Sequence, residues 1–286
     1  MTSSVTPGLV VVDKSGGMTS HDVVARVRRL AGTRKVGHAG TLDPMATGVL
    51  VLGVDRATRL LGHLMLTEKR YEATIRLGEA TSTDDAEGET LSTASVADVT
   101  EEQVRSALIA FVGEIDQVPT AVSSIKVDGK RAYQRVRDGE EVELAPRRVT
   151  VHELAVHDVA LPDVRISVRC SSGTYIRAIA RDLGKALGVG GHLTALRRTA
   201  VGAFDLGAAR TLDQLGESFA VLPIAEAARA TFPTLDLDDD QERDVRVGRA
   251  LDVSLGGLCA LFAPDGTFLA LYEPRDDGAR AVAVFV

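Results

Sequence analysis

The chain has 286 residues, of which 45% are hydrophobic and 26% are charged, a composition typical of a globular protein with one large domain and a small one. No stretch approaches 18 uninterrupted apolar residues, so we expect no transmembrane helix and no membrane partner. The polar residues 1–7 do not resemble a signal peptide. Two widely separated cysteines, Cys170 and Cys259, indicate a reducing compartment, and we expect a cytoplasmic protein.

The net charge of −7 is unevenly distributed along the chain. From Thr211 onward there are 14 acidic and 6 basic residues, whereas the first 210 residues carry a net charge of +1. A near-neutral body can carry local basic faces, and such faces determine the affinity for phosphate. The overall negative charge therefore does not exclude a nucleic-acid partner.

The first half of the chain mixes strand and helix patterns. Residues 9–12 are predicted to form a buried strand, and Thr19 with Asp22 forms a capping box that opens a helix ending at Gly32. Residues 37–48 contain three glycines and a proline and are predicted to be a loop. The patterns that follow predict strands at 49–54 and 71–77, a polar surface excursion at 81–98 and a helix from 100 to about 112.

The second half begins with a basic segment, 119–148, which shows little periodicity and is interpreted as an excursion from the core. It is followed by a predicted strand at 164–168, a helix after Gly173 and a strand at 196–204. Because strands and helices do not alternate strictly, we predict an α+β fold with a mixed, mainly antiparallel sheet. Turn signals between short apolar runs after residue 232 predict a small β-rich module.

Asp43 is the first candidate for chemistry. An aspartate before a proline in a glycine-rich turn is more often a turn former than a catalyst. However, the same loop carries His38 and lies between a basic helix and a buried strand, which is a usual position for a functional loop.

Three further segments combine basic residues with scarce aromatic residues. The chain has four tyrosines and no tryptophan, and Tyr71 and Tyr175 adjoin basic residues at the ends of predicted elements. Tyr175 and Arg177 fall off the apolar stripe of their helix, so they either cover a surface or bind a base beside a carboxylate. The segment 126–137 is either a solvated face or a polyanion contact. No phosphate loop, dinucleotide fingerprint or zinc motif is present, so we expect no cofactor and no metal.

Residues 37–50 closely resemble the catalytic motif of bacterial TruB-type tRNA pseudouridine synthases. Residues 69–71, 173–177 with 182–184, and 196–199 resemble further motifs of that family, and 117–133 matches in the same order. The resemblance is dense over roughly residues 8–204 and weak after Thr231. It implies a pseudouridine-synthase domain at 1–228 with an RNA-gripping insertion at about 119–148, and a PUA-like RNA-binding module at 229–286.

The resemblance implies that the chain isomerises uridine 55 in the T-stem loop of tRNA, as a monomer. Asp43 would attack C1′ or stabilise the detached-base intermediate, Arg177 would pair with it, and Tyr71 would stack on the base and shuttle a proton. Tyr175 and Leu196 would line the base pocket, and His38 would enter the gap left by the flipped base. The remaining residues implied to contact the RNA are Lys14 and Arg59 near the substrate backbone, and Lys126, Lys130, Arg131 and Arg135 in the insertion.

Two alternatives remain beside this interpretation. Another RNA specificity, such as ribosomal RNA, is possible within the same enzyme class, and an RNA chaperone that refolds tRNA belongs to a different class. The chain also departs from the family where Ser15 replaces a usual proline and where the C-terminal module is strongly acidic. The acidic module leaves open whether it contacts RNA or serves mainly for packing.

Overall fold

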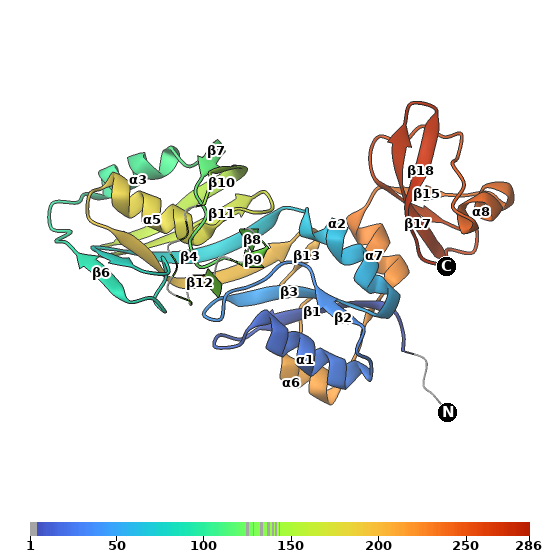
Figure 1. The fold of residues 1–286 in the computed structure, drawn as a ribbon, viewed down its shortest axis with the longest axis horizontal. Coiled ribbons are helices and arrows are strands. Elements are labelled where there is room, and N and C mark those ends of the chain that lie inside the picture. Colours follow the sequence, from blue (N-terminus) through green and yellow to red (C-terminus); the bar gives the residue numbers. More distant parts are fainter. Residues whose placement is uncertain are drawn as a thin grey trace.

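The computed structural model describes residues 5–123, 126–127, 129–131, 134–135, 138, 140, 142 and 144–286, with backbone alone at 126, 127, 130 and 131. The molecule is elongated, with a long sheet spanning its body and a small separate sheet at one end (Figure 1). This arrangement confirms the α+β fold with a mainly antiparallel core sheet and a β-rich C-terminal part.

The long sheet has ten strands in the order β14-β1-β3-β12-β4-β11-β10-β7, with β2 paired to β3 and β13 to β12. All of its pairings are antiparallel except β3 with β12, which are parallel and joined only at Arg197↔Thr47 and Arg198↔Gly48. The two halves of the sheet are therefore joined by a short seam at its centre. The strands are β1 (Gly8–Lys14), β2 (Val36–His38), β3 (Thr47–Val54), β4 (Lys69–Leu77), β7 (Gly113–Gln117), β10 (Arg147–Ala160), β11 (Asp163–Cys170), β12 (Gly191–Val201), β13 (Phe204–Asp205) and β14 (Leu222–Pro223).

One face of the long sheet is covered by helices that share a single hydrophobic core. Val23 and Val27 of α1 belong to the same buried cluster as Ile176 and Ile179 of α5, although these helices lie over different halves of the sheet. The predicted capping boxes are present, because Thr19 caps α1 with Asp22 and Thr100 caps α3 with Gln103. The helices on this face are α1 (Ser20–Ala31), α3 (Glu101–Ile109), α5 (Ile176–Ala186) and α6 (Leu212–Glu217).

The small sheet contains β15 (Thr234–Asp236), β16 (Cys259–Phe262), β17 (Phe268–Arg275) and β18 (Gly278–Val284), and α8 (Asp239–Arg246) packs beside it. Phe262, Phe268 and Phe285 form one buried cluster with Leu60 and Leu64, so this C-terminal module is packed firmly against the body. The contact is made by η1 (Asp55–Leu60), α2 (Leu61–Met65) and α7 (Ile224–Thr231).

Two sequence-based expectations require correction. The loop predicted at 37–48 begins with strand β2, whose Val36 is buried. The polar excursion at 81–98 is not wholly a surface feature: β5 (Glu79–Thr81) and β6 (Thr90–Thr93) form a hairpin, and the intervening Asp85 is only 3% exposed. A charged side chain is buried in this way only when it has a partner, and that partner lies in the site described below.

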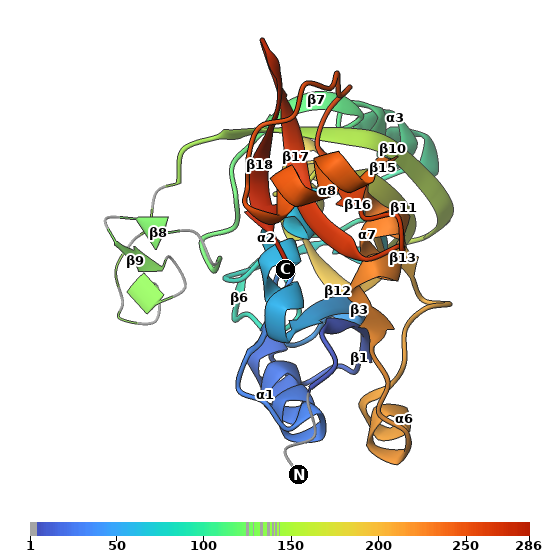
Figure 2. The same ribbon diagram turned by 90° about the vertical axis from the view of Figure 1, so that its right-hand side faces the viewer.

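The basic insertion is described only in part. Its short strands β8 (Lys126–Val127) and β9 (Lys130–Arg131) form a hairpin that stands out from the body (Figure 2). Among the described residues, no helix is long and apolar enough to cross a membrane. In the same part of the chain, no three His, Cys, Asp or Glu side chains gather as metal ligands.

Candidate active site

Buried polar side chains in the protein interior hold the loop that carries Asp43. The hydroxyl of Ser20, in the first turn of α1, donates to Leu42 O over 3.1 Å and accepts from Leu42 N over 2.9 Å. Ser20 is only 1% exposed, so loss of either bond would leave a buried polar group without a partner. The residue before Asp43 is thereby tied to the start of a rigid helix.

Lys14 supports the other side of the same loop. Its ammonium is fully buried and donates to the carbonyl oxygens of Ser15, Met18 and Pro44 at 2.9, 2.8 and 3.1 Å. Burial lowers the pKa of Lys14, while the nearby Asp43 carboxylate opposes that effect. Lys14 was expected near the substrate backbone; in this structure its side chain is directed into the protein and holds the loop that carries Asp43.

Arg198 provides the third support, and the sequence-based reasoning did not assign it a role. Its guanidinium is 2% exposed and donates to Val49 O at 2.7 Å, Gly40 O at 3.1 Å and Thr41 O at 3.3 Å. Because Arg198 lies at the short seam between the half-sheets, it connects the loop to strand β12. The position of Asp43 is thus set by residues from three separate elements.

Asp43 forms a two-point ion pair with Arg177, the second residue of α5. Arg177 Nη2 donates to Asp43 Oδ1 over 3.1 Å, and Nε lies 3.0 Å from Oδ2. Such bidentate geometry fixes both the position and the plane of the carboxylate. The Asp43 side chain remains 33% exposed, whereas that of Arg177 is 4% exposed. Arg177 therefore does not point to the surface, which was one of the two interpretations of its sequence position.

The remaining donors of Arg177 are also used. Nη1 donates to Thr83 O at 2.7 Å, Nη2 donates to Val122 O at 2.8 Å, and Nη1 lies 3.4 Å from Asp85 Oδ2. Asp85 is a second carboxylate on the same guanidinium, and it comes from the excursion predicted to be exposed. No sequence signal distinguished it, because an aspartate in a polar run is normally solvated.

Burial raises the pKa of Asp43, the ion pair with Arg177 opposes this effect, and the negative charge of Asp85 adds to it. The guanidinium favours the ionised form of Asp43. One side of the carboxylate is thus neutralised by a fixed cation, while the other side remains accessible to a reactant.

Asp43 and Arg177 lie in a cavity of about 290 Å³. Tyr71, Tyr175 and Leu196 line the same cavity, so the structure brings together the five residues predicted to handle the base. Burial raises the pKa values of the Tyr71 and Tyr175 hydroxyls, so both rings stay uncharged at neutral pH. A cavity with two aromatic rings, an apolar side chain and one carboxylate suits a nucleobase attached to a sugar.

Gln117 positions Tyr175 through the backbone. Its Nε2 donates to Tyr175 O over 3.0 Å, and Tyr175 N donates to its Oε1 over 2.8 Å. Gln117 is 3% exposed and lies at the end of β7, so it fixes the start of α5 against the edge of the sheet. Tyr175 and Arg177 thereby enter the cavity from a rigid helix terminus.

The sequence matches family models along most of its length. Residues 28–176 match the family described as TruB family pseudouridylate synthase (N terminal domain), residues 177–229 match the tRNA pseudouridylate synthase B C-terminal domain, and residues 232–286 match the tRNA pseudouridine synthase II C-terminal domain. The chain belongs to the TruB family.

Two curated relatives carry the name tRNA pseudouridine synthase B. The chain is 57% identical to the protein of Arthrobacter sp. (strain FB24) over 97% of this chain and 96% of that one, and 58% identical to the Thermobifida fusca (strain YX) protein over 97% and 98%. Among solved structures, a crystal structure of a Cbf5-Nop10-Gar1 complex matches with a TM-score of 0.78 and 26% identity, covering 99% of this chain and 86% of that chain.

Other residues predicted from the TruB resemblance lie outside the cavity lining. The His38 ring packs edge-on against that of His21, with ring centroids 5.8 Å apart. Arg59 donates to Val284 O over 2.6 Å and so links η1 to the C-terminal module. Arg135 pairs with Glu140 at 3.1 Å. The predicted RNA contacts Lys126, Lys130 and Arg131 have side chains outside the described residues.

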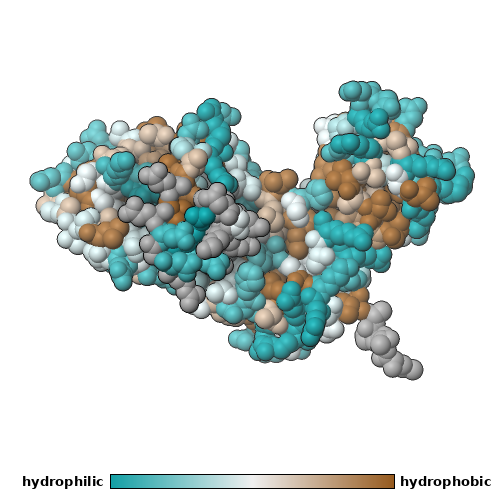
Figure 3. Space-filling model, viewed as in Figure 1, coloured by the Kyte–Doolittle hydropathy of each residue, from teal (hydrophilic) through white to brown (hydrophobic). Residues whose placement is uncertain are grey.

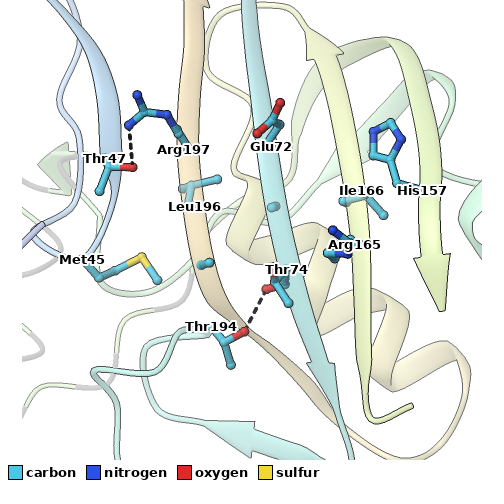
Figure 4. Close-up of a pocket in the computed structure, with 12 residues that line it drawn as sticks. Met45, Thr47, Glu72, Thr74, His157, Arg165, Ile166, Thr194, Leu196 and Arg197 are labelled. Atoms are coloured by element: carbon cyan, nitrogen blue, oxygen red, sulfur yellow. Dashed lines mark hydrogen bonds between the residues drawn. The ribbon is translucent and has the colours of Figure 1, made fainter. Parts of the chain in front are cut away.

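A second hollow, of about 580 Å³, lies across strands β12, β4, β11 and β10, with α5 behind them (Figure 4). It shares Leu196 with the cavity around Asp43, but its two arginines are paired with acids near the surface: Arg197 with Asp13 at 2.7 Å and Arg165 with Asp158 at 3.2 Å. None of its lining residues forms a buried, bidentate ion pair between an arginine and a carboxylate. The smaller cavity, where Asp43 is both oriented and accessible, is therefore the better candidate for an active site.

Proposed function

We propose that this chain converts uridine 55 in the T-stem loop of tRNA to pseudouridine, with Asp43 as its catalytic carboxylate. The observation that carries this proposal is the bidentate Asp43–Arg177 pair within a cavity lined by Tyr71, Tyr175 and Leu196. The tRNA substrate is supported by relatives named tRNA pseudouridine synthase B that match over nearly the whole chain. A solved relative bound to other proteins supports the family fold but does not bear on this substrate.

The reaction needs no net change in atoms. The bond from N1 of the base to C1′ breaks, the base turns, a bond forms from C5 to C1′, and the proton on C5 moves to N1 through solvent. The Asp43 carboxylate either bonds to C1′ or stabilises the electron-poor sugar by its charge. Arg177 would favour the ionised form of Asp43 and hold it in the cavity, and Tyr71, which lines the same cavity, would move the proton from C5.

The uridine must leave its stack to reach Asp43. Flipping a base costs a few kcal/mol, roughly, and stacking on aromatic side chains offsets part of that cost. Tyr71 and Tyr175 would supply the stacking surfaces and Leu196 the apolar wall. His38, near the start of α1, would fill the gap left in the RNA loop.

The domain roles follow from the same proposal. Residues 1–228 would carry out the reaction, with the insertion at about 119–148 gripping the RNA, and residues 229–286 would form a PUA-like module. Because the basic residues of this module form ion pairs, packing against η1 and α2 is better supported than binding to phosphate. The chain would act without a cofactor.

Asp43→Asn tests the proposal. This substitution keeps the shape of the side chain and removes its charge, so tritium release from C5-labelled tRNA transcript should fall below detection, while tRNA affinity should stay within about threefold. Asp98→Asn is the matched control, because Asp98 is exposed and lies outside the cavity. Turnover retained in Asp43→Asn would rule out the catalytic role of Asp43. Loss of turnover in both variants would point to general damage.

The chaperone alternative can be separated with the same variant. If refolding of tRNA is a second function, Asp43→Asn should still accelerate recovery of correctly folded tRNA after heating, because binding is retained. A variant that loses both properties together would show that no separate chaperone role exists.

A further inference from the structure

Helix α1 displays a row of arginines on its outer side. Val23, Val24 and Val27 face the core, whereas Arg26 and Arg29 are exposed on the opposite side. Arg28 is exposed as well, and Arg34 follows just after the Gly32 cap. We call these four arginines, 26, 28, 29 and 34, the α1 face. In Figure 1 this helix lies at the lower edge of the molecule, and Figure 3 shows hydrophilic residues over that region.

The charge of the α1 face is not neutralised. Within the described part of the chain, no carboxylate lies within ion-pair distance of Arg26, Arg29 or Arg34. Arg28 donates to Val36 O over 3.1 Å and so retains its charge. The nearest acid in sequence, Asp22, is occupied at the other end of the helix, where it accepts from Thr19 N at 2.9 Å and from Thr19 Oγ1 at 2.7 Å.

Elsewhere in the described structure, most exposed arginines are paired with acids. Arg56, Arg59 and Arg210 instead donate to backbone carbonyl oxygens, and Arg147 forms no ion pair with a described residue. All six basic residues after Thr211 form ion pairs, and the arginines over the second hollow do the same. The C-terminal pairs are Arg229 with Asp236, Arg243 with Asp240, Arg246 with Glu242, Arg249 with Asp244, Arg275 with Asp277 and Arg280 with Glu273. The α1 face differs because three exposed arginines without an acid partner among the described residues, Arg26, Arg29 and Arg34, lie on or just after a single helix.

A structural role explains only part of the α1 face. Cations in the last turn stabilise the negative end of a helix, which accounts for Arg28 and Arg29. That effect falls off within one turn and gives no reason for Arg26 or for Arg34, which lies beyond the helix. An uncompensated row of cations instead attracts a polyanion.

We propose that the α1 face binds backbone phosphates of the tRNA, at nucleotides other than the one held in the cavity. This inference rests on the tRNA substrate proposed above. The α1 face has no aromatic side chain and no cavity for a base, so its contacts would position the RNA without reading sequence. Since Ser20, at the start of the same helix, is bonded to Leu42 next to Asp43, RNA held on α1 is held in a fixed relation to the catalytic carboxylate.

The test compares two triple variants with the same change in charge. The first is Arg26→Gln, Arg29→Gln and Arg34→Gln. The control is Arg243→Gln, Arg275→Gln and Arg280→Gln, which removes three arginines of the C-terminal module that are paired with acids. Binding of full-length tRNA transcript is measured from 50 to 200 mM salt, and kcat and KM are measured by tritium release.

For the α1 triple we expect the slope of log affinity against log salt to fall by about 2, because each lost phosphate contact removes about 0.7–0.9. The loss of affinity between 50 and 200 mM salt should then be roughly 15-fold smaller than in the wild type. KM should rise while kcat at saturating tRNA stays unchanged. The control triple should leave the slope within about 0.5 of the wild type.

An unchanged slope in the α1 triple, or an equal fall in both triples, would overturn the proposal. The first result would show that the α1 face does not touch phosphate, and the second that only net charge matters. Binding is measured without turnover, so this test can fail while wild-type turnover on tRNA persists. Conversely, a fall in slope in the α1 triple together with no turnover by the wild type would contradict the proposed reaction but support phosphate binding by the α1 face.

Discussion

The cavity around Asp43 and the C-terminal module use the same residue types to opposite effect. In the cavity, one arginine that is 4% exposed holds two carboxylates. In the module, arginines such as Arg243 and Arg280, which are 71% and 62% exposed, each pair with one acid in solvent. Water screens the second kind of pair and is largely excluded from the first, so only the buried pair strongly affects stability and reactivity.

Substitution of Arg177 should have the largest effect on both stability and turnover. In Arg177→Gln, Asp43 and Asp85 would lose their shared counter-charge in a partly dry site, which should cost about 3 kcal/mol of unfolding free energy and abolish turnover. Urea unfolding followed by circular dichroism measures the first effect, and tritium release measures the second.

Arg181→Gln is the matched control on the same helix. Arg181 lies one turn further along α5, is 28% exposed and pairs with Asp84 and Asp182, so its loss should cost about 1 kcal/mol or less. Equal destabilisation by the two substitutions would mean that burial does not distinguish the two arginines.

The pH dependence of turnover tests how the charges around Asp43 set its pKa. The proposed mechanism requires ionised Asp43, so turnover should fall as pH drops through the pKa of Asp43, which burial places above the usual aspartate value. The negative charge of Asp85 contributes to that rise, so Asp85→Asn should lower the pKa of Asp43. The acid-side midpoint of kcat should then move to lower pH.

Asp163→Asn serves as the control for this profile, because Asp163 pairs with Arg76 on an exposed part of the sheet and does not contact the cavity. A midpoint that moves to higher pH in Asp85→Asn would contradict the assigned direction of the effect. Circular dichroism at each pH separates titration from acid unfolding.

The smallest effect is expected in the C-terminal module. Arg280→Gln removes an exposed ion pair with Glu273 and should change the unfolding free energy by less than about 0.5 kcal/mol. A double-mutant cycle with Glu273→Gln, measured by urea unfolding, isolates the pair itself. A coupling energy of about 2 kcal/mol or more would show that exposure is a poor guide to the strength of ion pairs in this protein.

Much of the fold follows from local sequence. The capping boxes at Thr19 and Thr100 and the alternation along β4 identify their elements, because caps and periodicity depend only on neighbouring residues. Turn signals between apolar runs likewise predict β16, β17 and β18 of the C-terminal module, but not the three-residue strand β15. Strand β2 was missed because it is only three residues long and begins a glycine-rich loop.

The residues of the cavity also fall into two groups, those indicated by sequence motifs and those revealed only by tertiary packing. From the sequence, the resemblance to TruB motifs implied that Asp43, Tyr71, Tyr175 and Arg177 belong to one site, because each lies within a compact motif that can be recognised locally. Only the tertiary structure decided that Asp85 is buried against Arg177, and that Lys14 and Arg198 support the loop from inside. These contacts join residues distant in sequence, and the burial that gives a charge its partner arises only when the sheet, α5 and the loop pack together.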